Sequence, residues 1–94
     1  VRRLIVALLL SSGHMSDSQP LLLAFGRVLQ KARKDRGVSQ QELALDCGLD
    51  RTFISLLERG KRQPSLTTLV TLGTSLDLEA DELVRKTLAA LKKQ

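Results

Sequence analysis

Apolar side chains recur at intervals of three and four residues through most of the chain after Pro20, and no stretch alternates apolar and polar residues as a half-buried strand would. Short turns that contain glycine or proline separate the apolar segments. The pattern therefore predicts an all-α domain of five helices. These helices are expected over about residues 20–36, 39–46, 50–59, 66–75 and 79–92.

Capping residues mark where the predicted helices begin. Ser39 with Glu42 three residues later forms a capping-box pattern, and Asp50 and Ser65 are further N-cap residues. Gly48 supplies the positive φ that a tight turn needs. The second and third helices are thus short and joined by a turn of three to four residues, which is the geometry of a helix-turn-helix motif.

The composition fits one small globular domain. The 94 residues suffice for one domain with a modest core. A single cysteine and a single histidine exclude a disulfide framework and a structural zinc site, and they favour a reducing compartment. The net charge is +5, and residues 27–62 hold nine bases against five acids. Clustered positive charge is typical of a polyanion binder, although a solvated basic surface gives the same balance.

The N-terminal segment looks foreign to the domain. Residues 1–10 combine two arginines with an apolar run that is too short to span a membrane. The tripeptide Gly13-His14-Met15 resembles the scar of a cloning site. We therefore expect residues 1–14 to be a vector-derived tag or leader and residues 15–94 to be a single helix-turn-helix domain.

Residues 39–60 read SQQELALDCGLDRTFISLLERG and resemble the Cro/repressor-type (XRE-like) helix-turn-helix family. The resemblance covers about residues 24–84. It rests on type and spacing at many positions: Ser39-Gln40, Leu43-Ala44, Gly48, Ile54-Ser55, Glu58, Gly60 and Pro64-Ser65-Leu66.

The resemblance implies a sequence-specific DNA-binding transcriptional regulator, expected to be a repressor. The recognition helix is the one predicted at about 50–59. Leu49, Ile54 and Leu57 are expected to hold this helix against the core, which leaves its opposite side facing outward. Base-reading residues on that side would be Arg51, Thr52, Ser55 and Leu56. Phosphate contacts would come from Ser39, Gln40, Lys61, Arg62 and Ser65. The resemblance also predicts a structural salt bridge between Arg33 and Glu58.

One recognition helix contacts few base pairs, so we expect a homodimer on a palindromic operator of double-stranded DNA. The candidate dimerisation helix is the one at about 79–92. Its predicted interface residues are Leu83, Val84, Thr87, Leu88 and Leu91. No cofactor, metal, small-molecule ligand or membrane partner is expected, and the predicted location is the cytoplasm, on the bacterial or phage nucleoid.

Three alternatives remain open from the sequence. A restriction-modification controller or an antitoxin has the same kind of stand-alone domain. A protein-interaction module that keeps the fold without binding DNA is a second reading, and Leu56 and Phe53 leave room for it; Phe53 is expected to pack partly into the core more readily than to face DNA. An enzyme is the least favoured, because the sequence has no phosphate loop, nucleophile elbow or metal cluster.

Overall fold

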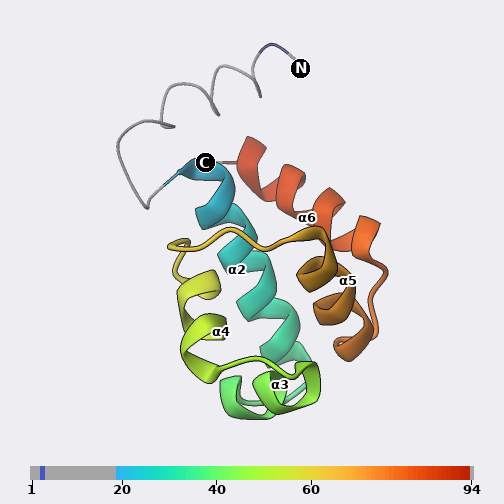
Figure 1. The fold of residues 1–94 in the computed structure, drawn as a ribbon. Coiled ribbons are helices and arrows are strands. Elements are labelled where there is room, and N and C mark those ends of the chain that lie inside the picture. The colour runs from blue at the N-terminus through green and yellow to red at the C-terminus, as the bar shows by residue number, and fades with distance from the viewer. Residues whose placement is uncertain (1–2, 4–18, 94) are drawn as a thin grey trace.

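The computed structural model describes residue 3 and residues 19–93 and shows an all-α domain in that part (Figure 1). The fold class predicted from the sequence is confirmed, and each predicted helix boundary lies within one residue of the observed one. The prediction of a tag or leader over residues 1–14 concerns residues outside the described part, apart from Arg3. The helices are α2 (Pro20–Asp35), α3 (Gln40–Cys47), α4 (Arg51–Glu58), α5 (Leu66–Ser75) and α6 (Ala80–Lys92).

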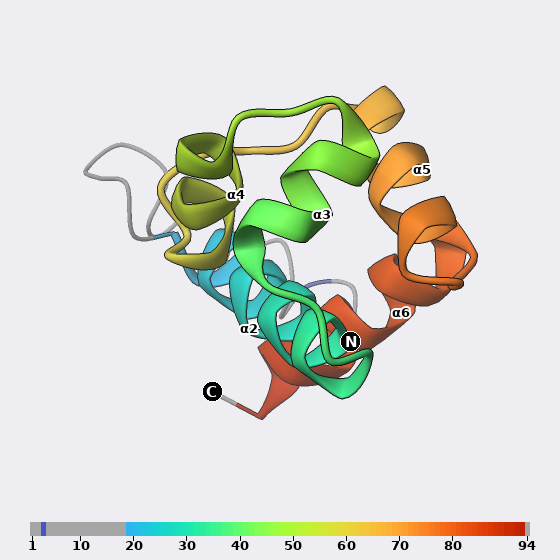
Figure 2. The ribbon, with the colours of Figure 1, turned by 90° about the horizontal axis from the view of Figure 1, so that it is seen from below.

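Helix α2 is the centre of the packing. It lies between α4 on one side and α6 on the other, while α3 packs on α4 and α5, and α5 packs on α6 (Figure 2). The core between these helices is almost entirely aliphatic, and burying its leucines and isoleucine contributes roughly 1.5–3 kcal/mol for each side chain. Its fully buried large side chains are Leu29, Leu43, Ile54, Leu57, Leu72, Leu83 and Leu91.

A glycine lets α2 and α4 approach closely. A Cβ atom added at Gly26 would lie 2.7 Å from the carbonyl oxygen of Leu57, closer than carbon and oxygen tolerate. Any other residue at this position would force the two helices apart. The backbone of α4 is therefore held directly against α2.

The apolar side of α5 differs from the sequence expectation. The spacing of Leu66, Leu69, Val70 and Leu72 in the sequence predicts one shared buried side, but Leu66 is 76% exposed and Val70 is 51% exposed. Gly73 presses against the carbonyl oxygen of Leu78, which turns the side of α5 that carries Leu72 into the core. Val70 lies two residues before the buried Leu72, about 160° around the helix from it, and so faces outward.

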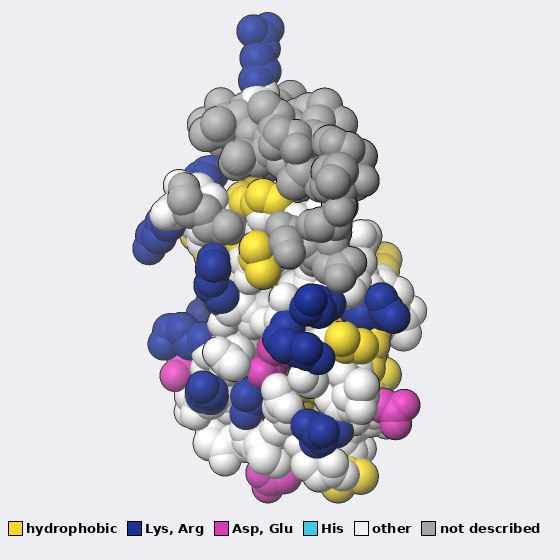
Figure 3. Space-filling model, turned by 90° about the vertical axis from the view of Figure 1, so that its left-hand side faces the viewer, with side chains coloured by type: hydrophobic (Ala, Val, Ile, Leu, Met, Phe, Trp, Pro, Cys, Tyr) yellow, Lys and Arg dark blue, Asp and Glu magenta, His cyan; other side chains and the backbone are white. Residues whose placement is uncertain are grey.

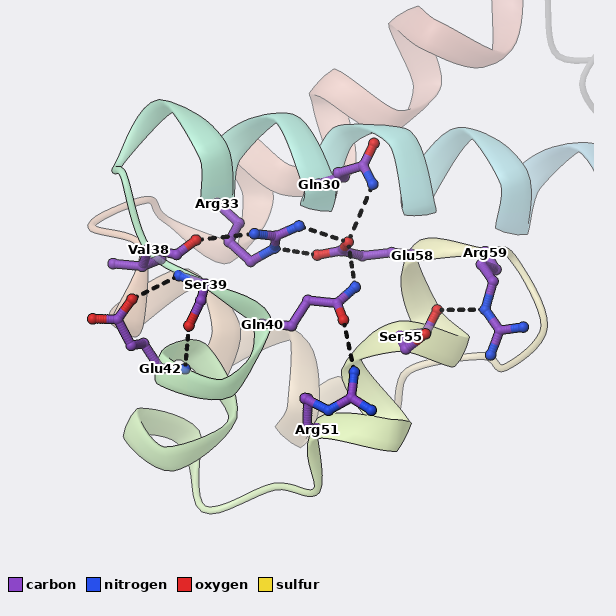
Figure 4. Close-up of polar contacts among 10 residues, drawn as sticks. All are labelled: Gln30, Arg33, Val38, Ser39, Gln40, Glu42, Arg51, Ser55, Glu58 and Arg59. Carbon is purple, nitrogen blue, oxygen red and sulfur yellow. Dashed lines mark hydrogen bonds and ion pairs between the residues drawn. The ribbon is translucent and has the colours of Figure 1, made fainter.

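A buried ion pair ties α2 to α4 (Figure 4). The Nε of Arg33 donates to Glu58 Oε2 at 2.6 Å, and its Nη2 donates to Glu58 Oε1 at 3.0 Å. The Arg33 and Glu58 side chains are only 9% and 1% exposed. These are the two residues that the family resemblance pairs. The remaining guanidinium nitrogen, Nη1, donates to the carbonyl oxygen of Val38 at 2.9 Å, so the loop before α3 is held as well.

Two glutamines complete the surroundings of the Glu58 carboxylate. Gln40 and Gln30 donate their Nε2 groups to Oε1 at 3.0 and 3.4 Å. Burial pulls the pKa of Glu58 upward, but the hydrogen bonds from Arg33, Gln40 and Gln30, together with the charge of Arg33, outweigh it and hold the pKa below its ordinary value. The carboxylate therefore stays ionised in the folded protein.

We expect Glu58→Ala to lower the free energy of unfolding by about 3–5 kcal/mol, because it leaves the Arg33 charge buried without a partner. Urea unfolding followed by circular dichroism measures this change. The matched control is Asp35→Ala, which removes the acid of the exposed Lys31–Asp35 pair and should cost under about 1 kcal/mol. Equal losses in the two variants would contradict the structural role of the buried pair.

The same pair predicts how stability depends on pH. Because the folded-state pKa of Glu58 is lowered, its contribution is complete above the unfolded-state pKa of about 4.3 and is lost as the pH falls through the folded-state value. The stability difference between the parent chain and Glu58→Gln should therefore be constant above about pH 5 and shrink on further acidification. A difference that grows on acidification would mean that the ionised carboxylate does not stabilise the fold.

Candidate nucleic-acid interface

Local hydrogen bonds and a glycine turn define the α3-turn-α4 segment. The Ser39 hydroxyl accepts the backbone N–H of Glu42 at 3.0 Å, and Glu42 Oε1 accepts the backbone N–H of Ser39 at 2.8 Å, which completes the capping box. Gly48 ends α3 with a φ of 67°, and the N–H of Leu49 returns to the Ala44 carbonyl at 2.9 Å. Helix α4 then begins at Arg51, with Asp50 at the N-cap position.

Helix α4 presents its first turn to solvent. Arg51 and Thr52 are exposed, whereas Ser55 and Leu56 are half-buried. The first two are therefore the most accessible of the four predicted base-reading residues. Phe53 is partly buried and packs against the core, which agrees with the preferred of its two interpretations. A duplex that approaches this helix meets polar and cationic groups first.

Gln40 connects the buried ion pair to the exposed Arg51 (Figure 4). Its Nε2 donates to Glu58, and its Oε1 accepts Arg51 Nη1 at 3.3 Å. A carboxylate accepts hydrogen bonds and cannot donate them, so Glu58 dictates which end of the Gln40 amide faces it. The amide oxygen is thereby turned toward Arg51. Gln40 braces α3 against α4 and orients a cation on the outer surface.

The predicted phosphate-contact residues differ in exposure and in whether they cap a helix. Both Ser39 and Ser65 already serve as helix caps, Ser65 by accepting the N–H of Thr68 at 3.0 Å. Lys61 and Arg62 are exposed in the loop after α4. These two are the cations of the predicted set, and neither is a helix cap, whereas the Gln40 amide is engaged with Glu58 and Arg51.

Arg59 was not singled out from the sequence. It is exposed at the C-terminal end of α4, and its Nε donates to the Ser55 carbonyl at 3.3 Å, which places the guanidinium on the Ser55 side of the helix. Its spacing of four residues from Ser55 could have indicated that the two side chains lie on the same side of the helix. Lys and Arg side chains predominate over acidic ones on the face that carries α4 (Figure 3).

Three of the predicted dimer-interface residues belong instead to the protomer's own core. Leu83, Thr87 and Leu91 are buried where α6 packs on α2 and α5, so the prediction was wrong for these residues. They recur every four residues and form the stripe that closes the domain. Val84 and Leu88 lie beside this stripe, and Val84 is 41% exposed.

Val84 and Leu88 line an apolar hollow of about 170 Å³. Leu69 from α5 and Phe25 from α2 contribute to the same hollow, together with Pro64 from the loop before α5. The hollow therefore joins three helices and the loop before α5. It is a largely apolar surface that remains after the core of the protomer has formed.

Other chemistry is sparse in the described part of the chain. No group of three or more His, Cys, Asp or Glu side chains there is placed to hold a metal ion. Burial raises the pKa of the half-buried Cys47 thiol, so it is a poor nucleophile. None of the described helices is both long and apolar enough to cross a membrane.

Comparisons with known proteins agree with this geometry. A family model described as helix-turn-helix matches residues 29–83. The crystal structure of the restriction-modification controller protein C.AhdI from Aeromonas hydrophila is similar, with 44% identity, a TM-score of 0.65, and coverage of 66% of this chain and 94% of that one. Control protein C.MunI from Mycoplasma sp is 39% identical over 62 residues, covering 65% of this chain and 84% of its own.

A third similar protein was solved on DNA. The controller protein C.Esp1396I, a tetramer in complex with its natural 35 base-pair operator, shows 28% identity and a TM-score of 0.68 over 76% of this chain and 93% of that one. The family model covers more than half of the chain, including α3, the turn and α4. The chain therefore belongs to the helix-turn-helix family of DNA-binding regulators, of the Cro/repressor (XRE-like) type.

Proposed function

We propose that this chain is a transcriptional regulator, expected to be a repressor, that binds a palindromic operator as a homodimer. The observation that carries the proposal is the exposed first turn of α4, where Arg51 is oriented by Gln40 and Thr52 stands beside it. The two ends of the Arg51 guanidinium suit the O6 and N7 acceptors of guanine in the major groove. Lys61 and Arg62, neighbours in the loop after α4, would contact phosphates beside that groove.

The same proposal assigns the dimer to the apolar hollow. With Leu83, Thr87 and Leu91 used in the core, Val84 and Leu88 are the residues of the predicted interface that a second copy reaches. An isologous contact there would place two α4 helices on one side of the dimer, one for each half-site about 34 Å apart. No catalytic activity is assigned to the chain.

A role as a restriction-modification controller is the second candidate, favoured over an antitoxin by a specific observation. C.AhdI is named as a restriction-modification controller protein and C.MunI as a control protein, and this chain aligns with 94% and 84% of their respective lengths. A restriction endonuclease and a methyltransferase gene next to the coding sequence would support it, whereas a toxin gene in that place would favour the antitoxin.

The decisive experiment is a selection of random duplexes on the purified chain at about physiological salt, read by sequencing. A two-fold-symmetric motif is expected. Folded, helical protein that enriches no sequence would overturn the proposal and favour the protein-interaction module.

Two variants separate base reading from phosphate contact. Arg51→Ala should weaken operator binding by about 1–3 kcal/mol and relax the preference at one base pair in each half-site. Lys61→Ala, the matched control, should weaken operator and unrelated duplexes alike and reduce the salt slope of log K by about 1 for each protomer. Fluorescence anisotropy over a salt series measures both. If Arg51→Ala weakened all sequences equally, Arg51 would be a phosphate contact.

The dimer surface is tested without DNA. Val84→Glu places a charge in the apolar hollow and should shift the chain from dimer to monomer in analytical ultracentrifugation, with unchanged helicity. Leu45→Glu is the control, because Leu45 is 71% exposed on α3 and lies outside the hollow. A dimer that survives Val84→Glu, or one that dissociates equally in both variants, would remove the interface from this surface.

A further inference from the structure

A groove between α2 and α6 has not been used by any of the contacts described so far. Its floor consists of small or short apolar side chains, Val28 and Ala32 from α2 and Ala89 and Ala90 from α6, and its volume is about 290 Å³. Small side chains on both walls let another helix approach closely. The floor is continuous with the domain, since Val28 and Ala32 also pack on the core.

Lysines form the rim of this groove. Lys31 lies on the α2 side, and Lys86 and Lys93 lie on the α6 side. The single acid on the rim, Asp35, is paired with Lys31 at 3.2 Å. Among the described residues, Lys86 and Lys93 have no ion-pair partner. The groove therefore combines an apolar floor with two cations two helical turns apart.

The position of the groove separates it from both surfaces of the proposed function. Helix α2 lies between α6 and α4 (Figure 2). The groove is on the α6 side of α2, so a duplex on α4 is held away from it. At about 100° per residue, Lys86 and Ala89 lie on the opposite flank of α6 from Val84 and Leu88. Neither operator binding nor dimerisation accounts for this surface.

We propose that the groove between α2 and α6 binds an acidic amphipathic helix of another protein. Charge complementarity favours this occupant: carboxylates spaced by about two turns would reach Lys86 and Lys93 while apolar residues between them fill the floor. A phosphate backbone has no apolar groups to cover that floor.

The chain offers no better occupant of its own. Residues 1–18 contain two arginines and a single acid, Asp17, so that segment does not match a cationic rim. Asp81 and Glu82 lie in the first turn of α6 and therefore cannot fold back onto a groove formed by its later turns. A second copy of the chain does carry this acidic turn, and the test below distinguishes it.

The test is an NMR titration of the ¹⁵N-labelled full chain, without DNA, with a synthetic amphipathic helical peptide whose leucine and alanine stripe is flanked by glutamates. The control peptide has lysine in place of every glutamate. Shift changes are expected at Val28, Ala32, Ala89 and Ala90 with the acidic peptide alone. Lys86→Glu/Lys93→Glu should weaken its affinity about tenfold or more, because two attractive contacts become repulsive.

A matched variant separates the groove from net charge. Lys34→Glu/Lys92→Glu makes the same charge change at exposed positions outside the groove and should leave the affinity unchanged. An equal loss in both variants, shifts centred on α4 or Leu88, or no binding of the acidic peptide would overturn the proposal. So would the same shift pattern on concentrating the chain alone, because the occupant would then be a second copy. Operator binding by Lys86→Glu/Lys93→Glu is measured separately, so failure here leaves the proposed function standing.

Discussion

The buried carboxylate of Glu58 organises the region of the molecule that faces DNA. An ionised carboxylate inside a protein is tolerated only when donors surround it, and here those donors come from Arg33, Gln30 and Gln40. Two belong to α2 and one to α3, while Glu58 itself closes α4. Satisfying one charge therefore fixes three helices relative to one another. Replacing Glu58 by an apolar residue would remove the hydrogen bonds that hold α3 and α4 in place relative to α2.

This arrangement links stability to recognition. Gly26 brings the α4 backbone against α2, and the ion pair holds it in register there. Gln40 donates a hydrogen bond to the Glu58 carboxylate and accepts one from Arg51, so the position of the carboxylate determines how Arg51 is oriented at the surface. Because the chain of contacts runs from a buried charge to an exposed one, the cation proposed to read a base is positioned before DNA arrives. Such preorganisation reduces the conformational entropy lost on binding.

Different sides of helix α6 make different contacts. Its buried stripe closes the core through Leu83, Thr87 and Leu91. One flank of that stripe carries Val84 and the proposed dimer surface, and the other carries Lys86 and the proposed partner groove. Successive residues point about 100° apart around a helix, so different residues of α6 can face the core, the hollow and the groove. The three surfaces can therefore be altered separately by substitution.

The sequence by itself determined the helices, their caps and the helix-turn-helix motif, because these depend on local periodicity and on short-range hydrogen bonds such as the Ser39–Glu42 box. The resemblance to the family pattern also paired Arg33 with Glu58. Tertiary packing alone decided which apolar residues were left outside. Leu66 and Val70 turned outward and Leu91 turned inward, since a helix rotates about its axis to suit its neighbours and a single sequence does not record that rotation. The link from Glu58 through Gln40 to Arg51 likewise required α3 and α4 to pack together, and local sequence rules carry no distance information between residues on different helices.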